Sequence, residues 1–162
     1  MNDINLPCDR VRETAYAIHV FHGHGHLEKV YENALAHRLK KAGIDVKQQH
    51  PIQIFDEDGT LVGEYYADMV VEGALIVELK ATKALGAEHQ AQILGYLAGA
   101  RLDHGLLINF GSYKFQIRKF ARSKGPGGML TGWAPPVFSA ISAFVVAQFS
   151  RWIERNISFK GP

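Results

Sequence analysis

The stretch over residues 65–83, YYADMVVEGALIVELKATK, constrains the fold more than any other part of the chain. Its apolar residues are mostly good strand formers, and they run on both sides of an EG dipeptide, so the stretch predicts a β-hairpin. Asp68, Glu78 and Lys80 interrupt these apolar runs. Charged side chains are rarely buried unless they are paired or bind an ion. Their presence in an apolar hairpin therefore makes these three residues candidates for a functional site.

The turn of the hairpin decides which charges share a face. Side chains on a strand alternate between two faces, so Glu78 and Lys80 lie on the same face. A two-residue turn would put Asp68 on the opposite face. A three-residue turn, with Gly73 as a left-handed bulge, puts Asp68 on their face, beside Ile76 and diagonal to Glu78. The second register is favoured because it leaves the other face wholly apolar, with Met69, Val71, Leu75, Val77 and Leu79.

In that register the charged face is a candidate metal site. Two carboxylates held close together repel each other unless a proton or a cation lies between them. Hard oxygen ligands suit Mg²⁺ or Mn²⁺, and an adjacent lysine can stabilise developing charge or orient an attacking water. A solvent-facing strand with a Glu–Lys ion pair explains the same spacing equally well.

Periodicity predicts the remaining elements and an α/β (α+β) fold. Helices are expected over residues 7–20, 26–42 and 87–100, with Gly43 as a C-terminal cap. Strands are expected over 46–55, 61–71, 74–81, 104–111 and 114–122, with a turn at 56–59. The core order is therefore α-β-β-β-α-β-β, which predicts a central mixed sheet flanked by helices.

Composition indicates an ordinary globular chain. The 162 residues are enough for one domain, and the net charge of +2 is too small to indicate nucleic acid by itself. Cys8 is the only cysteine, so no internal disulfide can form and a reducing cytoplasm is the simplest compartment. We expect neither a secretory signal at the N-terminus nor a membrane span, because no apolar run reaches about 20 residues.

The flanking helices carry further polar residues. Glu28 borders the apolar stripe of its helix, where it could point toward the sheet; stabilisation of the helix N-terminus is the simpler explanation. Gln92 and Tyr96 are four residues apart and share a helix face, with His89 one turn earlier. A solvated rim explains this pair without any function.

A resemblance to a known family connects these residues. GHLEKVY, over residues 25–31, is similar to the signature of the GxxExxY family, and the likeness continues through GEYYADMVVEGALIVELKA, HQAQILGYL and GLLINFGS, over about residues 9–122. That family resembles a branch of the PD-(D/E)XK nuclease superfamily. The resemblance implies a restriction-endonuclease-like core and an Mg²⁺- or Mn²⁺-dependent nuclease that hydrolyses phosphodiester bonds, with DNA as the favoured substrate.

The resemblance also implies roles for individual residues. Asp68 and Glu78 match the two metal-binding acids, and Lys80 matches the active-site lysine. Glu28 matches the acid of the first core helix, a further metal ligand or an orienting group, and the carbonyl of Leu79 is expected to join the metal shell.

Gln92 and Tyr96 match the QxxxY element that some of these nucleases carry near the site. Two departures stand out. Ala67 replaces the proline of the motif, and HGHGH stands where a Leu-Gly-Pro-Gly-type turn is common.

A basic segment is a candidate for contact with nucleic acid. Phosphate contacts by Lys and Arg dominate nucleic-acid affinity. The expected contacts are Lys83, Lys114, Arg118, Lys119 and Arg122. A charged edge strand that resists aggregation is an equally weighted alternative.

Two other features stand outside this assignment. His22, His24 and His26 alternate with glycine; they suit a borderline metal such as Zn²⁺, but a plain turn is the favoured explanation because no cysteine pair is near. Residues 1–124 are expected to form the nuclease-like domain, 125–136 a Gly/Pro linker, and 137–162 a helical extension. That extension is expected to dock on the core or to mediate a homodimer, with an interfacial membrane helix as the alternative.

The sequence is also compatible with two other functions. The first is a catalytically silent nuclease fold that binds nucleic acid or protein. The second is a partner protein that assembles through its C-terminal helix. The intact set of Asp68, Glu78 and Lys80 argues against the first. The second would be weakened if deletion of residues 125–162 gave a monomer with unchanged activity.

Overall fold

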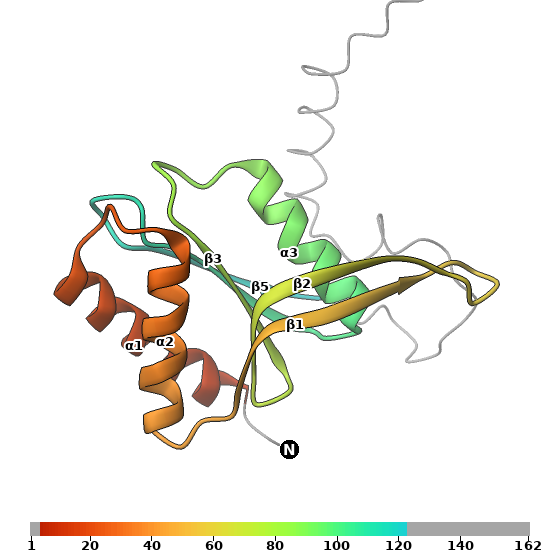
Figure 1. The fold of residues 1–162 in the computed structure, drawn as a ribbon, viewed down its shortest axis with the longest axis horizontal. Coiled ribbons are helices and arrows are strands. Elements are labelled where there is room, and N and C mark those ends of the chain that lie inside the picture. Colours follow the sequence, from red (N-terminus) through yellow and green to blue (C-terminus); the bar gives the residue numbers. More distant parts are fainter. Residues whose placement is uncertain (1–3, 123–162) are drawn as a thin grey trace, which may run out of the picture. The chain divides into compact units, whose positions relative to one another are not determined.

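The computed structural model describes residues 4–122, whose elements follow one another in the predicted order. They are α1 (Asn5–His22), α2 (Glu28–Lys41), β1 (Val46–Phe55), β2 (Leu61–Val71), β3 (Leu75–Lys80), α3 (Ala87–Ala100), β4 (His104–Asn109) and β5 (Gln116–Ala121) (Figure 1). Where element ends differ from the prediction, they differ by one or two residues. The expected linker and C-terminal helix lie outside the residues described.

A five-stranded mixed sheet forms the centre, with the order β1-β2-β3-β4-β5. Neighbouring strands are antiparallel except β3 and β4, which are parallel. A parallel pair needs a long crossover, and α3 supplies it. This arrangement confirms the predicted α+β class, with β5 at an edge as expected.

Helices cover both faces of the sheet. In Figure 1, α1 and α2 lie together on one face and α3 lies on the other. The first face packs the apolar stripes of α1 and α2 against Met69, Val71, Leu75, Val77 and Leu79, which is the wholly apolar face predicted for the hairpin. The second face packs Ile93 and Leu97 of α3 against Val70 and Ile76. No helix within residues 4–122 is long and apolar enough to cross a membrane.

The β2–β3 turn confirms one part of the predicted register and corrects another. Val71 pairs with Leu75, so three residues form the turn, and Gly73 has the expected left-handed conformation with φ of 63°. The expected place of Asp68 beside Ile76 is wrong, because Val70 occupies it. The ladder places Asp68 level with Glu78, because the three-residue turn lies one residue farther along the chain than the expected pairing requires.

Strand alternation is interrupted where β1 and β2 pass the site. Ala67 and Met69 are two residues apart, yet they pack on opposite faces of the sheet. The residue between them, Asp68, lies across from Gln49 of β1, whose φ is 49°. A left-handed residue other than glycine is uncommon and marks a local distortion. The distortion therefore coincides with the position of the first candidate carboxylate.

Candidate active site

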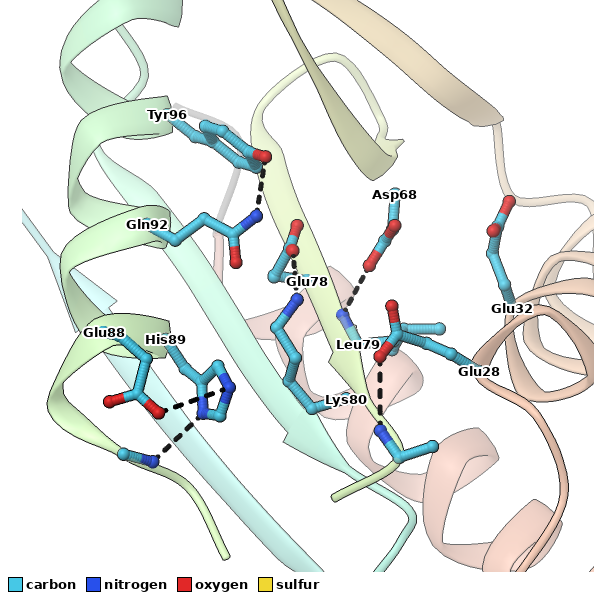
Figure 2. Close-up of polar contacts among 12 residues, drawn as sticks. Glu28, Glu32, Asp68, Glu78, Leu79, Lys80, Glu88, His89, Gln92 and Tyr96 are labelled. Carbon is cyan, nitrogen blue, oxygen red and sulfur yellow. Dashed lines mark hydrogen bonds and ion pairs between the residues drawn. The ribbon is translucent and has the colours of Figure 1, made fainter.

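Strand β2 separates from β3 at Asp68, and the two strands form a fork there between Asp68 and residues 78–80. The paired residues end at Met69 and Val77, and beyond them the backbone N–H of Leu79 donates a hydrogen bond of 2.8 Å to Oδ2 of Asp68 (Figure 2). The N–H and carbonyl of one strand residue point to the same edge, so the Leu79 carbonyl also faces this fork. Burial raises the pKa of Asp68, against the opposing effect of the Leu79 N–H.

Glu78 is the most deeply buried carboxylate of the site. It is 2% exposed, and its Oε1 atom lies 2.7 Å from Nζ of Lys80. Its Oε2 atom is buried and has no hydrogen-bond partner. Burial, and then the charge of Asp68, raise the pKa of Glu78 to about 7. A buried oxygen without a partner is costly, which indicates that another group binds there.

Lys80 remains a cation in this setting. Burial by itself lowers the pKa of Lys80, but its hydrogen bond to Glu78 and the negative charges around it raise that pKa above the ordinary value. Glu28 and Asp68 add to the effect of Glu78. The ammonium group therefore stays available to interact with an anion at the fork.

Glu28 approaches the same fork from α2, which lies on the face of the sheet opposite α3 (Figure 1). It is the first residue of α2, and its Oε2 accepts a hydrogen bond of 3.2 Å from the N–H of Ala81, just after β3. Burial is the main cause that raises the pKa of Glu28. Stabilisation of the helix end is thus only part of its role, because the side chain ties α2 to the strand that carries Glu78 and Lys80.

Gln92 and Tyr96 border the site from α3. Nε2 of Gln92 donates a hydrogen bond of 2.8 Å to the hydroxyl of Tyr96, and both side chains face the Glu78 side of β3 (Figure 2). Tyr96 is buried, so the solvated-rim explanation does not apply to it. His89, one turn earlier, has a local role, since its Nδ1 accepts a hydrogen bond from the N–H of Gly86 at the helix start.

Two neighbours of the site were missed by sequence reasoning. Glu32 is 3% exposed, and its carboxylate accepts hydrogen bonds from Lys29, Gln48 and Gln49 at 2.7–3.0 Å. Gln49 also acts on Asp68, where it lowers the pKa of that carboxyl against the larger effect of burial. A signal was present in the spacing of Glu28 and Glu32, because like charges four residues apart destabilise an isolated helix.

The oxygen atoms at the fork fit a hard divalent cation. Within residues 4–122, no three His, Cys, Asp or Glu side chains come together closely enough to hold a metal ion by themselves. Asp68 and Glu78 provide two carboxylates, and the Leu79 carbonyl faces the same space. The unpartnered Oε2 of Glu78 is the atom that such an ion would satisfy.

The predicted basic contacts do not form one group. Lys83 is exposed and lies three residues after the end of β3. Lys114 precedes β5 at the end where Gln116 pairs with Asn109, which is also the end of Lys80. The others lie progressively farther along β5: Arg118 opposite Leu107, Lys119 opposite Leu106, and Arg122 beyond Ala121. Nζ of Lys119 also donates a hydrogen bond of 3.0 Å to Oδ1 of Asn5.

The histidine segment is an ordered turn between α1 and α2. The Tyr31 hydroxyl donates a hydrogen bond to the carbonyl of Gly23 and accepts one from the N–H of His26. Gly23 and Gly25 have positive φ, which accounts for glycine at both positions. These contacts support the simpler explanation, a turn whose shape is held by Tyr31.

The comparisons with known proteins agree with this geometry. A search of curated proteins finds no significant match. A solved structure titled "Crystal structure of SSO0001" resembles the chain with a TM-score of 0.50 and 13% sequence identity, over 79% of this chain and 58% of that one. At that identity the likeness concerns the fold alone. A family model described as the PD-(D/E)XK nuclease superfamily matches residues 7–120, most of the chain and all of the elements that build the fork. The chain therefore belongs to the PD-(D/E)XK nuclease superfamily.

Proposed function

We propose that this protein is a metal-dependent nuclease that hydrolyses phosphodiester bonds, with DNA as the favoured substrate. One observation carries the proposal: the buried, unpartnered Oε2 of Glu78 at the fork beside Asp68 and Lys80. Membership of the PD-(D/E)XK superfamily supports it, because nucleases of this superfamily generally are phosphodiesterases that use a divalent metal. The GxxExxY motif over residues 25–31 suggests the branch to which the chain belongs.

The metal ligands of the proposed site are Asp68, Glu78 and the carbonyl of Leu79, with Glu28 as a further ligand or orienting group. Bound there, Mg²⁺ or Mn²⁺ would supply Lewis-acid activation of a water and neutralise charge on the phosphate. The Leu79 N–H holds Asp68 at the fork through its hydrogen bond.

Lys80 and the α3 pair complete the proposed mechanism. The Lys80 ammonium donates hydrogen bonds to the attacking water or to a phosphate oxygen as negative charge develops. Gln92 and Tyr96 orient that phosphate from the other side of Glu78. Water adds to phosphorus, the bond to the 3′-oxygen breaks, and the products carry a 5′-phosphate and a 3′-hydroxyl, as the superfamily resemblance implies.

A cleavage assay tests the proposal. The substrates are circular and linear duplex DNA, single-stranded DNA and RNA, each with Mg²⁺, Mn²⁺ or EDTA. We expect cleavage of at least one DNA substrate with metal, none in EDTA, and none by Lys80→Ala. Cleavage by Lys80→Ala at the wild-type rate would place the activity elsewhere.

A silent binding module is the second candidate. It is favoured by one observation, that within residues 4–122 no three His, Cys, Asp or Glu side chains are grouped so that they could hold a metal ion. Binding of DNA without cleavage under every metal condition would support it. Size-exclusion chromatography of the full chain and of a chain ending at residue 124 separately tests the homodimer proposed for the C-terminal helix.

A further inference from the structure

Tyr65 is an exposed aromatic residue beside the site. It lies on β2, three residues before Asp68, which corresponds to roughly 10 Å of strand. Its residue surface is 51% exposed. Single exposed aromatic residues are ordinary and need no function, so exposure alone does not distinguish Tyr65.

The contact of Tyr65 with α3 does distinguish it. Its ring lies 5.8 Å from the ring of Tyr96, centroid to centroid, at an angle of 38°. The Tyr96 hydroxyl in turn accepts a hydrogen bond from Gln92, and its ring lies on the Glu78 side of β3 (Figure 2). The two rings therefore form an aromatic pair beside the site, in which Tyr96 is the buried member and Tyr65 the exposed one.

The orientation of Tyr65 is fixed by the sheet. Tyr65 pairs with Ile52 of β1, and Ile52 packs in the core beneath α3. Tyr66, the next residue, points to the opposite face of the same strand and has nearly the same exposure, 52%. The two tyrosines thus face opposite sides of β2, and the Tyr66 hydroxyl in addition donates a hydrogen bond to the carboxylate of Glu64.

We infer that Tyr65 stacks on an unpaired base of the strand whose phosphate lies at Lys80, and hence that the preferred substrate is single-stranded at the point of cleavage. Every base offers a π-face, so aromatic stacking accepts any sequence. A base inside a duplex has both faces covered and is not accessible without unstacking. This inference rests on the proposed function, because it places the scissile phosphate at the fork.

Metal-free binding tests the inference separately from catalysis. Anisotropy of a labelled oligonucleotide in EDTA is measured for the full chain, with the single strand and with the same sequence as a duplex. Tyr65→Leu should weaken single-strand binding about tenfold and duplex binding less than about twofold, since stacking is lost. Tyr65→Phe retains the ring and should bind as wild type does. Tyr66→Leu is the matched control and should change neither affinity by more than about twofold.

Abasic substitution gives a second measurement that leaves the protein unaltered. An abasic site is moved along the single strand one position at a time. Wild type should lose affinity at one position, and Tyr65→Leu should show no such dependence. If wild type is indifferent to every position, or if Tyr65→Leu weakens both substrates equally, the inference is overturned.

The outcomes separate the two proposals. Cleavage without dependence on Tyr65 overturns the stacking inference and leaves the nuclease function standing. Single-strand binding that depends on Tyr65, without any metal-dependent cleavage, overturns the nuclease function and leaves base stacking by Tyr65 standing. Absence of binding to both substrates overturns the inference for this chain.

Discussion

Glu32 and Glu78 are two carboxylates of nearly equal burial with opposite surroundings. Glu32, on α2, is 3% exposed and both of its oxygens accept hydrogen bonds from Lys29 and the two glutamines of β1. Glu78, on β3, is 2% exposed, and one of its oxygens has no partner. A satisfied buried charge supports structure, whereas an unsatisfied one is retained at a cost to stability. The difference supports the proposal that Glu78 takes part in catalysis, whereas Glu32 stabilises the fold around it.

The largest expected effect separates the two residues by activity. Glu78→Gln should reduce the cleavage rate about 10³-fold, because the neutral amide cannot bind a divalent cation as a carboxylate does. Glu32→Gln, as the matched control, should lower the rate by less than about tenfold, through the position of Gln49. The measurement is the single-turnover rate with Mg²⁺. Equal losses in both variants would contradict the distinction.

For stability, we expect the opposite order, with a larger loss on replacing Glu32 than on replacing Glu78. Glu32→Ala should lower the free energy of unfolding by about 2–3 kcal/mol, because Gln48 and Gln49 lose a charged hydrogen-bond acceptor. Glu78→Ala in metal-free buffer should lower it by less. Urea unfolding followed by circular dichroism provides the comparison. A larger loss for Glu78→Ala would show that Glu78 stabilises the fold.

The pH dependence of stability sharpens the comparison. Burial raises the folded-state pKa of Glu78 to about 7, so its contribution to stability is fully present below the unfolded value of 4.5 and is lost as pH rises through 7. Glu78→Gln carries no charge and avoids this loss. Between pH 5 and pH 8 in EDTA, the stability of Glu78→Gln relative to wild type should rise by about 2 kcal/mol. A difference independent of pH would contradict the raised pKa.

The smallest effect concerns the ion pair of Glu32. Lys29 lies 2.7 Å from Glu32, but its side chain is 56% exposed, and water screens the attraction. Lys29→Ala should therefore lower the free energy of unfolding by less than about 1 kcal/mol in urea. A loss above about 2 kcal/mol would mean that Lys29, rather than the glutamines, satisfies the buried carboxylate.

Sequence reasoning reached most of this site through short-range rules. The period-2 pattern of the hairpin placed Asp68, Glu78 and Lys80 together, because strand alternation depends only on neighbouring residues. The exact level of Asp68 was missed by one pair, since turn length alone did not settle the pairing. The roles of Glu28, Gln92 and Tyr96 came from the family resemblance rather than from spacing.

Residues that act through distant partners could not be found in this way. Glu32 and Gln49 are 17 positions apart in the chain, and only the packing of α2 on β1 brings them together. The left-handed conformation of Gln49 could not be predicted, because glycine and asparagine are the residues that usually adopt it. The contact between Tyr65 and Tyr96 likewise exists only because α3 covers that face of the sheet.

Local sequence patterns were enough to predict the order of helices and strands, the apolar face of the hairpin and the candidate ligand types near the fork. These depend on local periodicity, on turn chemistry and on the charges that the residues carry. The tertiary structure decided which carboxylate is satisfied and which is left with an unpartnered oxygen. That distinction depends on hydrogen bonds between segments far apart in the chain, and these form only when the helices have packed on the sheet.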